Sequence, residues 1–196
     1  MKVAFGMKAH SGWAALVVVG RRDGEIEVTD RRRIDLVEEE WAKQPYHAAD
    51  GLKPGAARET VARGIEAANR IALRELRAAV RRERERENRV EACGVLVGNP
   101  MPDWSVEEIL AVHFRMHKAE GVLFRDALAK ATQSCGLVLL ALDEKTLKKQ
   151  AGIAFGSAAR GLIGRIESLG RSVGPPWGKD QKEAALAALV ALQSRS

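Results

Sequence analysis

The segment over residues 3–19 constrains the fold more than any other part of the chain. It reads VAFGMKAHSGWAALVVV, in which two hydrophobic stretches flank a short polar turn that contains Lys8, His10 and Ser11. Hydrophobic runs bounded by turn residues are typical of strands. The segment therefore predicts a strand, a tight turn and a second strand, and this pair is expected to form the nucleus around which the rest of the chain is arranged.

The residues that follow are expected to extend this pair into an antiparallel meander. Asp23 and Gly24 form a hairpin signal, because both residue types accept positive backbone angles. Over residues 25–36 hydrophobic and polar side chains then alternate, which is typical of a solvent-facing edge strand. Residues 38–54 show no period and are predicted to be a loop or lid, in which His47 is expected to be solvated.

The remainder of the chain predicts alternating helices and strands. The expected helices cover residues 56–88, 106–135 with a kink at Gly121, and 180–192, with a loose helical segment over 144–167 and a loop over 170–178. The expected buried strands cover residues 90–97 and 137–142. A long crossover helix before residues 90–97 favours a strand parallel to the first. We therefore expect an α/β fold in one domain over residues 1–196, with an N-terminal antiparallel meander and parallel strands in one mixed sheet flanked by helices.

Composition narrows the class of protein. Of 196 residues, 46% are hydrophobic and 30% charged, which is ordinary for a globular chain. Cys93 and Cys135 lack zinc-ligand spacing and are expected to be small core residues in the reducing cytoplasm. With neither a signal-peptide pattern nor a long hydrophobic run, no secretion and no membrane are expected. The net charge of +6 favours an anionic partner such as nucleic acid, and nothing in the sequence indicates an oligomeric state.

Three short motifs and the order of the expected elements carry a family resemblance. The motifs are GMKAHSGW at residues 6–13, KAEGVL at 118–123 and DQKEAA at 180–185. Together they resemble the RuvC-type Holliday-junction resolvases and their YqgF-like relatives in the RNase H-like superfamily. The resemblance implies an RNase H-like fold, a nucleic-acid partner and a divalent metal cofactor.

The residues that the resemblance assigns to the metal are incomplete. Resolvases of this kind cut a phosphodiester bond with divalent metal held by carboxylates from the first strand, the end of the fourth strand and the last helix. Here the first-strand position falls on Met7 or Lys8, and Asn99 follows the strand at 90–97. Acids remain only at Asp180 and Glu183. This pattern favours a catalytically degenerate nucleic-acid-binding or regulatory module.

A second group of residues offers an alternative metal site. His113, His117 and Glu120 are spaced to lie on one helix face, where two histidines can share a transition metal and Glu120 could act as a ligand or general base. A divergent metal-dependent hydrolase or nuclease would use as catalytic residues His117, Glu120, Asp180 and Glu183. Its metal ligands would be His113, His117, Asp180 and Glu183. In the plainer interpretation the histidines are partly exposed, and Glu120 accepts a hydrogen bond or forms an ion pair with Arg115 or Lys118.

The charged run RRERERE at residues 81–87 allows a third interpretation. Opposite charges three residues apart can support each other at a solvated helix end. The same run could instead contact nucleic acid. If it binds a protein partner, the chain would be a structural or protein-interaction module. Whether the protein is an enzyme stays open among these three hypotheses.

Overall fold

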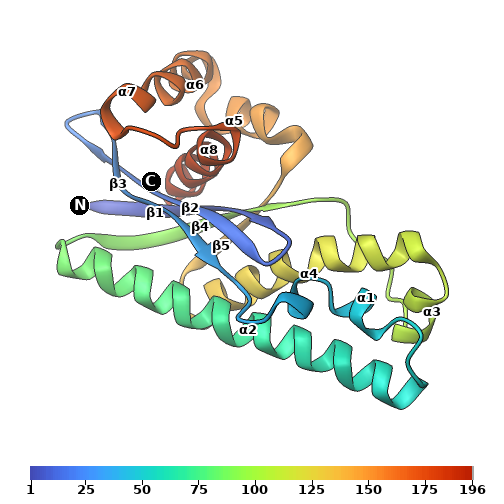
Figure 1. Cartoon of the computed structure of the whole chain (residues 1–196). Helices are drawn as coiled ribbons and strands as arrows, with labels where there is room; N and C mark the ends of the chain where they lie inside the picture. The colour runs from blue at the N-terminus through green and yellow to red at the C-terminus, as the bar shows by residue number, and fades with distance from the viewer. Residues whose placement is uncertain (196) are drawn as a thin grey trace.

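The computed structural model describes residues 1–195 and is built on one five-stranded mixed sheet (Figure 1). The strands are β1 (Lys2–His10), β2 (Trp13–Arg22), β3 (Glu25–Asp35), β4 (Arg89–Val97) and β5 (Val138–Asp143). Their order across the sheet is β3-β2-β1-β4-β5. Antiparallel pairing joins β1, β2 and β3 in a meander, whereas β4 and β5 are parallel to β1. The predicted α/β fold with a mixed sheet is confirmed.

Helices cover both faces of this sheet (Figure 1). On one face lie α1 (Pro45–Ala49), α2 (Pro54–Glu85), α3 (Val106–Leu110) and α4 (His113–Ser134). On the other lie α5 (Leu147–Phe155), α6 (Ala159–Ser168), α7 (Gly170–Val173) and α8 (Lys179–Gln193). Short 3-10 turns occupy Glu40–Lys43, Glu144–Thr146 and Gly156–Ala158. Within residues 1–195, no helix combines the length and the apolar character that a membrane span requires.

The central strand β1 sends alternate side chains into two separate cores, because successive residues of a strand face opposite sides of the sheet. Phe5 and Met7 are fully buried in the core that the sheet shares with α2 and α4. Ala4 belongs to the core on the α8 side, and Lys8 lies on that side too, in contact with acidic residues of α8. Of the two candidates for the first-strand position, Lys8 is therefore the one that faces α8.

Small residues allow α8 to lie directly on the sheet. A Cβ atom placed on Gly6 of β1 would overlap the carbonyl oxygen of Ala184. One placed on Gly94 of β4 would lie 2.5 Å from the carbonyl oxygen of Ala187. Since real Cβ atoms do not approach backbone atoms this closely, both strand positions require glycine. The alanine-rich sequence of α8 meets the two glycines without intervening side chains, which fixes the helix close to β1.

Residues 38–54 and 106–135 differ from their predicted structures. The first segment is not a loop, since it holds a 3-10 turn and α1, which begins at Pro45 where a proline is favoured. The second is two helices that separate at residues 111–112, because Val112 has an extended backbone. Gly121 lies inside the continuous helix α4. The break places His113 at the first position of α4.

The strand β5 is also less buried than predicted. It forms an edge of the sheet, with β4 as its neighbour on one side only. Val138 is consequently 40% exposed. The side chains of β5 are hydrophobic because helices pack near the two faces of the sheet. Within the described part of the chain, the outer edge of this strand has no neighbouring strand.

The charged end of α2 is anchored rather than simply solvated. Glu83 is fully buried, and its carboxylate accepts hydrogen bonds from Thr29 at 2.9 Å, Arg86 at 2.6 Å and Asn88 at 2.8 Å. Buried carboxylates require such partners. The inward side of this charged run therefore holds α2 against β3 and the start of β4.

The two cysteines are free and differ in burial, which predicts their reactivity. Burial raises the pKa of Cys93 from 9.0 to about 12 and also raises the pKa of Cys135, which is only half-buried. Because the thiolate is the nucleophile, a raised pKa leaves less reactive thiol at pH 8. We expect iodoacetamide to label Cys135 first and Cys93 only after unfolding in urea, as read by mass spectrometry. Rapid labelling of Cys93 in the folded protein would contradict this assignment.

Candidate functional site

Lys8 lies at the centre of an acidic cluster where β1 and β5 end. Its Nζ atom is 2.5 Å from Glu183 Oε2, 3.0 Å from Glu144 Oε1 and 3.2 Å from Asp180 Oδ1. The lysine side chain is only 7% exposed. Three carboxylates thus surround one nearly buried cation, and this group is called the Lys8 cluster below.

The topology explains how distant parts of the chain build this cluster. Because β1 and β5 are parallel members of one sheet, their carboxyl ends lie at the same edge. Glu144 follows β5 directly and therefore lies at that edge beside Lys8. Asp180 and Glu183 are three residues apart in the first turns of α8, so both point from one face of that helix. The close packing of α8 on β1 brings this face over Lys8.

The charge of Lys8 is secured by its partners. Burial alone would favour the neutral amine, but hydrogen bonds with Glu183, Glu144 and Asp180 outweigh burial and raise the pKa of Lys8 above its ordinary value of 10.5. A lysine whose pKa is higher in the folded than in the unfolded state stabilises the fold fully below the unfolded value. That contribution is lost only as the pH rises above 10.5 and through the folded pKa.

His10 extends the Lys8 cluster toward solvent. Its Nε2 atom is 3.0 Å from Asp180 Oδ2, and its ring stacks on Trp13 with ring centroids 4.3 Å apart. Stacking fixes the plane of the imidazole, and the contact with the carboxylate fixes its direction. Asp180 is therefore held on two sides, by Lys8 and by His10.

A Mg²⁺ ion, which the resemblance implies, does not fit the Lys8 cluster. Magnesium requires several oxygen ligands at about 2.1 Å in octahedral geometry. Among residues 1–195, no three carboxylates bring oxygen atoms within 4.8 Å of one another. Lys8 Nζ already occupies the space between them, Arg125 lies 3.5 Å from Glu144, and Lys179 lies 3.8 Å from Glu183. The negative charge that would attract a divalent ion is thus balanced by side chains of the protein.

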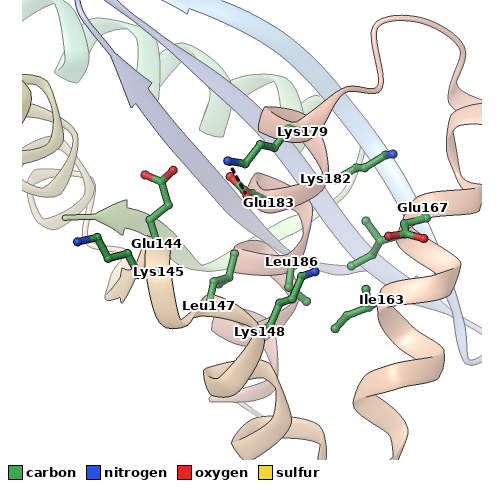
Figure 2. A pocket seen from close by; sticks show the side chains of 11 residues that line it. Glu144, Lys145, Leu147, Lys148, Ile163, Glu167, Lys179, Lys182, Glu183 and Leu186 are labelled. Carbon is green, nitrogen blue, oxygen red and sulfur yellow. Dashed lines mark ion pairs between the residues drawn. The ribbon is translucent and has the colours of Figure 1, made fainter.

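Two hollows flank the Lys8 cluster and together form what we call the basic groove. One, of about 510 Å³, lies between α5, α6 and α8 (Figure 2), and the other, of about 630 Å³, runs along α4. The basic side chains that line them are Lys118, Arg125, Lys145, Lys148, Lys179 and Lys182. The acidic ones are Glu144, Glu167 and Glu183. The excess of basic groups favours anionic ligands.

The histidines predicted as metal ligands lie in a second cluster. His113 and His117, in the first two turns of α4, have their Nε2 atoms 3.1 Å apart. His47 of α1 joins them, with its ring centroid 5.1 Å from that of His113 and 4.7 Å from that of His117. Its Nδ1 atom lies 2.8 Å from the nearly buried carboxylate of Glu120. The expectation that His47 is solvated is therefore wrong.

The structure divides the predicted site residues between these two clusters. His113, His117 and Glu120 lie with His47, and Asp180 and Glu183 lie with Lys8. His117 and Glu183 line the same hollow, yet their bonding partners differ. Asn99, the residue expected after the fourth strand, also lines that hollow.

Three residues of the clusters were missed by sequence reasoning. Glu144 directly follows a predicted strand, and this position at the carboxyl edge of a parallel sheet could have identified it. Arg125 reaches Glu144 from α4, and its guanidinium passes so close to Gly98 that a Cβ there would overlap it. For His47 no local signal exists, because its partners lie on a different helix, far along the chain.

Comparison with known proteins places this arrangement in a fold. Neither a protein-family model nor a curated protein matches the sequence. Among solved structures, the chain is similar to Thermus thermophilus RuvC in complex with a Holliday junction substrate, with a TM-score of 0.53 and 14% identity over 100% of this chain and 96% of that one. The chain has an RNase H-like fold of the RuvC type. A second Thermus thermophilus RuvC structure matches 98% of this chain and 95% of its own, with 17% identity and a TM-score of 0.49.

The RuvC-type fold confirms the fold that the three motifs implied. In this fold the resemblance assigns an acid to the first strand, and the side chain of β1 that faces α8 is instead Lys8. The ammonium of Lys8 forms three ion pairs at this position.

Proposed function

We propose that this protein is a nucleic-acid-binding module with a RuvC-type fold in which metal-dependent cleavage has been lost. The observation that carries the proposal is the position of the Lys8 ammonium, within 3.2 Å of Glu144, Asp180 and Glu183. The ammonium of this lysine supplies the positive charge among the carboxylates that a metal ion would otherwise supply. It stabilises the acids as structural ion pairs and leaves none of them free to hold a metal.

The basic groove supports nucleic acid as the ligand. Phosphate groups bind basic side chains and release counterions, which supplies most of the affinity in sequence-independent binding. Phe114 lines the hollow along α4 and is 72% exposed, so its ring is available to stack on an unpaired base. The similar RuvC structure contains a Holliday junction, which makes a four-way DNA junction the natural first probe.

Binding to a labelled four-way junction and to single-stranded DNA, followed by fluorescence anisotropy, tests the proposal. We expect log Kd to rise linearly with log salt. The double variant Lys145→Ala/Lys179→Ala removes two groove cations and should lower the salt slope by about 2. The matched variant Lys2→Ala/Lys53→Ala loses the same charge away from the groove and should keep the slope of the unmodified protein.

Two results would overturn this proposal. Binding that does not change with salt would exclude phosphate contacts as its basis. Cutting of the junction in Mg²⁺ or Mn²⁺ that disappears in Asp180→Asn would exclude catalytic degeneracy, since the Lys8 cluster would then be an active nuclease site.

The hydrolase hypothesis needs residues from both clusters to act together. Glu120 is held by His47, and Asp180 is held by Lys8 and His10. Neither carboxylate is free to reach across the groove as a base or ligand. For this reason we favour nucleic-acid binding.

A further inference from the structure

We propose that His47, His113 and His117 form a binding site for a divalent transition-metal ion such as Zn²⁺. One ring nitrogen of each histidine lies within 4.8 Å of those of the other two, and this is the one such group among residues 1–195. The site involves no residue of the Lys8 cluster. His117 also lines the basic groove, so the two sites are neighbours that use different ligand chemistry.

The two histidines of α4 already have the spacing of shared ligands. They are four residues apart and so lie one above the other on the helix. Their Nε2 atoms are 3.1 Å apart. Two nitrogen ligands at about 2.0 to 2.1 Å from a tetrahedral zinc ion are themselves about 3.3 Å apart. A metal could thus bind both rings with very little movement of either.

His47 is oriented as a third ligand by Glu120. Both oxygens of the Glu120 carboxylate lie 2.8 Å from His47 Nδ1, and Oε1 also accepts the backbone N–H of His47 at 3.1 Å. Because a carboxylate accepts hydrogen bonds, Nδ1 is the donor in this contact, which leaves Nε2 of the neutral imidazole as the nitrogen that can bind a metal. A carboxylate behind a ligating histidine is the usual arrangement around protein-bound zinc. Glu120 is 3% exposed, so this orientation is fixed by a buried group.

The donor set indicates the class of metal. Three imidazole nitrogens suit Zn²⁺, Co²⁺ or Ni²⁺, whereas Mg²⁺ and Ca²⁺ prefer oxygen ligands. His113 and His117 are exposed, and His117 lines the hollow along α4. A metal on three protein ligands would therefore keep one coordination position open for a water molecule or a ligand from solvent.

Titration of the purified chain with Co²⁺ alone tests the site, because tetrahedral Co²⁺ has characteristic visible absorption. We expect one ion per chain and complete displacement by Zn²⁺. His47→Gln, His113→Gln and His117→Gln should each weaken binding at least 100-fold, whereas His10→Gln, which changes the remaining histidine of the chain, should leave the affinity unchanged. Glu120→Gln should weaken binding 10- to 100-fold, as expected for a residue that positions a ligand.

Circular dichroism of each variant verifies folding, and the exposed positions of His113 and His117 make these two substitutions structurally mild. Absence of stoichiometric Co²⁺ binding, or unchanged binding in His113→Gln and His117→Gln, would overturn the proposal. Unchanged binding in His47→Gln would also overturn it, because the site would then be a helical pair without α1. Junction binding measured in EDTA tests the proposed function separately, so failure of one leaves the other intact.

Discussion

Replacing Lys8 with alanine should lower the free energy of unfolding by about 3 kcal/mol at neutral pH. Breaking a buried ion pair by removing one partner typically costs 3 to 5 kcal/mol, because the other charge is left uncompensated. Here Glu144, Asp180 and Glu183 keep 24 to 27% of their side chains exposed, so water offsets part of the loss. Urea denaturation measures the change, and Lys8→Met controls for the loss of the aliphatic stem.

The same variant should acquire a response to divalent cations. Once the ammonium is gone, three carboxylates face one another across the space it filled, and millimolar Mg²⁺ or Ca²⁺ should recover part of the lost stability. The unmodified protein should show no comparable stabilisation, because Lys8 already balances the acids. Equal stabilisation of both proteins by Mg²⁺ would mean that the ion binds elsewhere or alongside Lys8, which contradicts our account of the cluster.

Replacing Gly6 with alanine should be at least as damaging, at about 3 kcal/mol or more. The added methyl group would overlap the carbonyl oxygen of Ala184, and a backbone atom in the middle of a helix cannot turn aside as a flexible side chain can. Overpacking a core usually costs 1 to 3 kcal/mol, and a backbone collision lies at the upper end of that range. Displacing α8 would also draw Asp180 and Glu183 away from Lys8.

Gly121→Ala is the matched control for this prediction. Gly121 lies inside α4, is exposed, and has open space where a Cβ would be added. Alanine has the higher helix propensity by about 1 kcal/mol, so this variant should be as stable as the unmodified protein or slightly more stable. Thermal unfolding of the two variants side by side separates a general cost of losing glycine from the specific contact between β1 and α8. Similar losses in both would contradict the proposed contact.

Local sequence patterns were sufficient to predict the strands of the sheet and the order in which they follow one another along the chain. The Asp23-Gly24 turn and the alternation after it required only short-range chemistry, and the structure confirms the hairpin that they indicated. The break at residues 111–112 was missed because residues 106–135 read as continuously helical. Val112 has an extended backbone between the two helices, and no Gly or Pro marks that position.

Only part of the candidate site could be predicted from the sequence, because contacts between separate elements leave no local pattern. Spacing on one helix identified His113 with His117, and Asp180 with Glu183. It could not identify His47, which reaches its partners through the packing of α1 on α4. The choice between Met7 and Lys8 depends on which side of the sheet each residue faces, and only the folded chain shows that α8 lies on the same side as Lys8.

The position of α8 has a consequence for how the chain folds. Lys8 and Glu183 are separated by 175 positions, so this ion pair closes a very long loop. Contacts of such separation form slowly, because the chain must lose much conformational entropy before they are made. Until α8 docks, the central strand exposes a lysine without counterions beside an uncovered apolar face. During synthesis the sheet would therefore stay incomplete until α8 has left the ribosome, and the docking of Asp180 and Glu183 on Lys8 would then complete the fold.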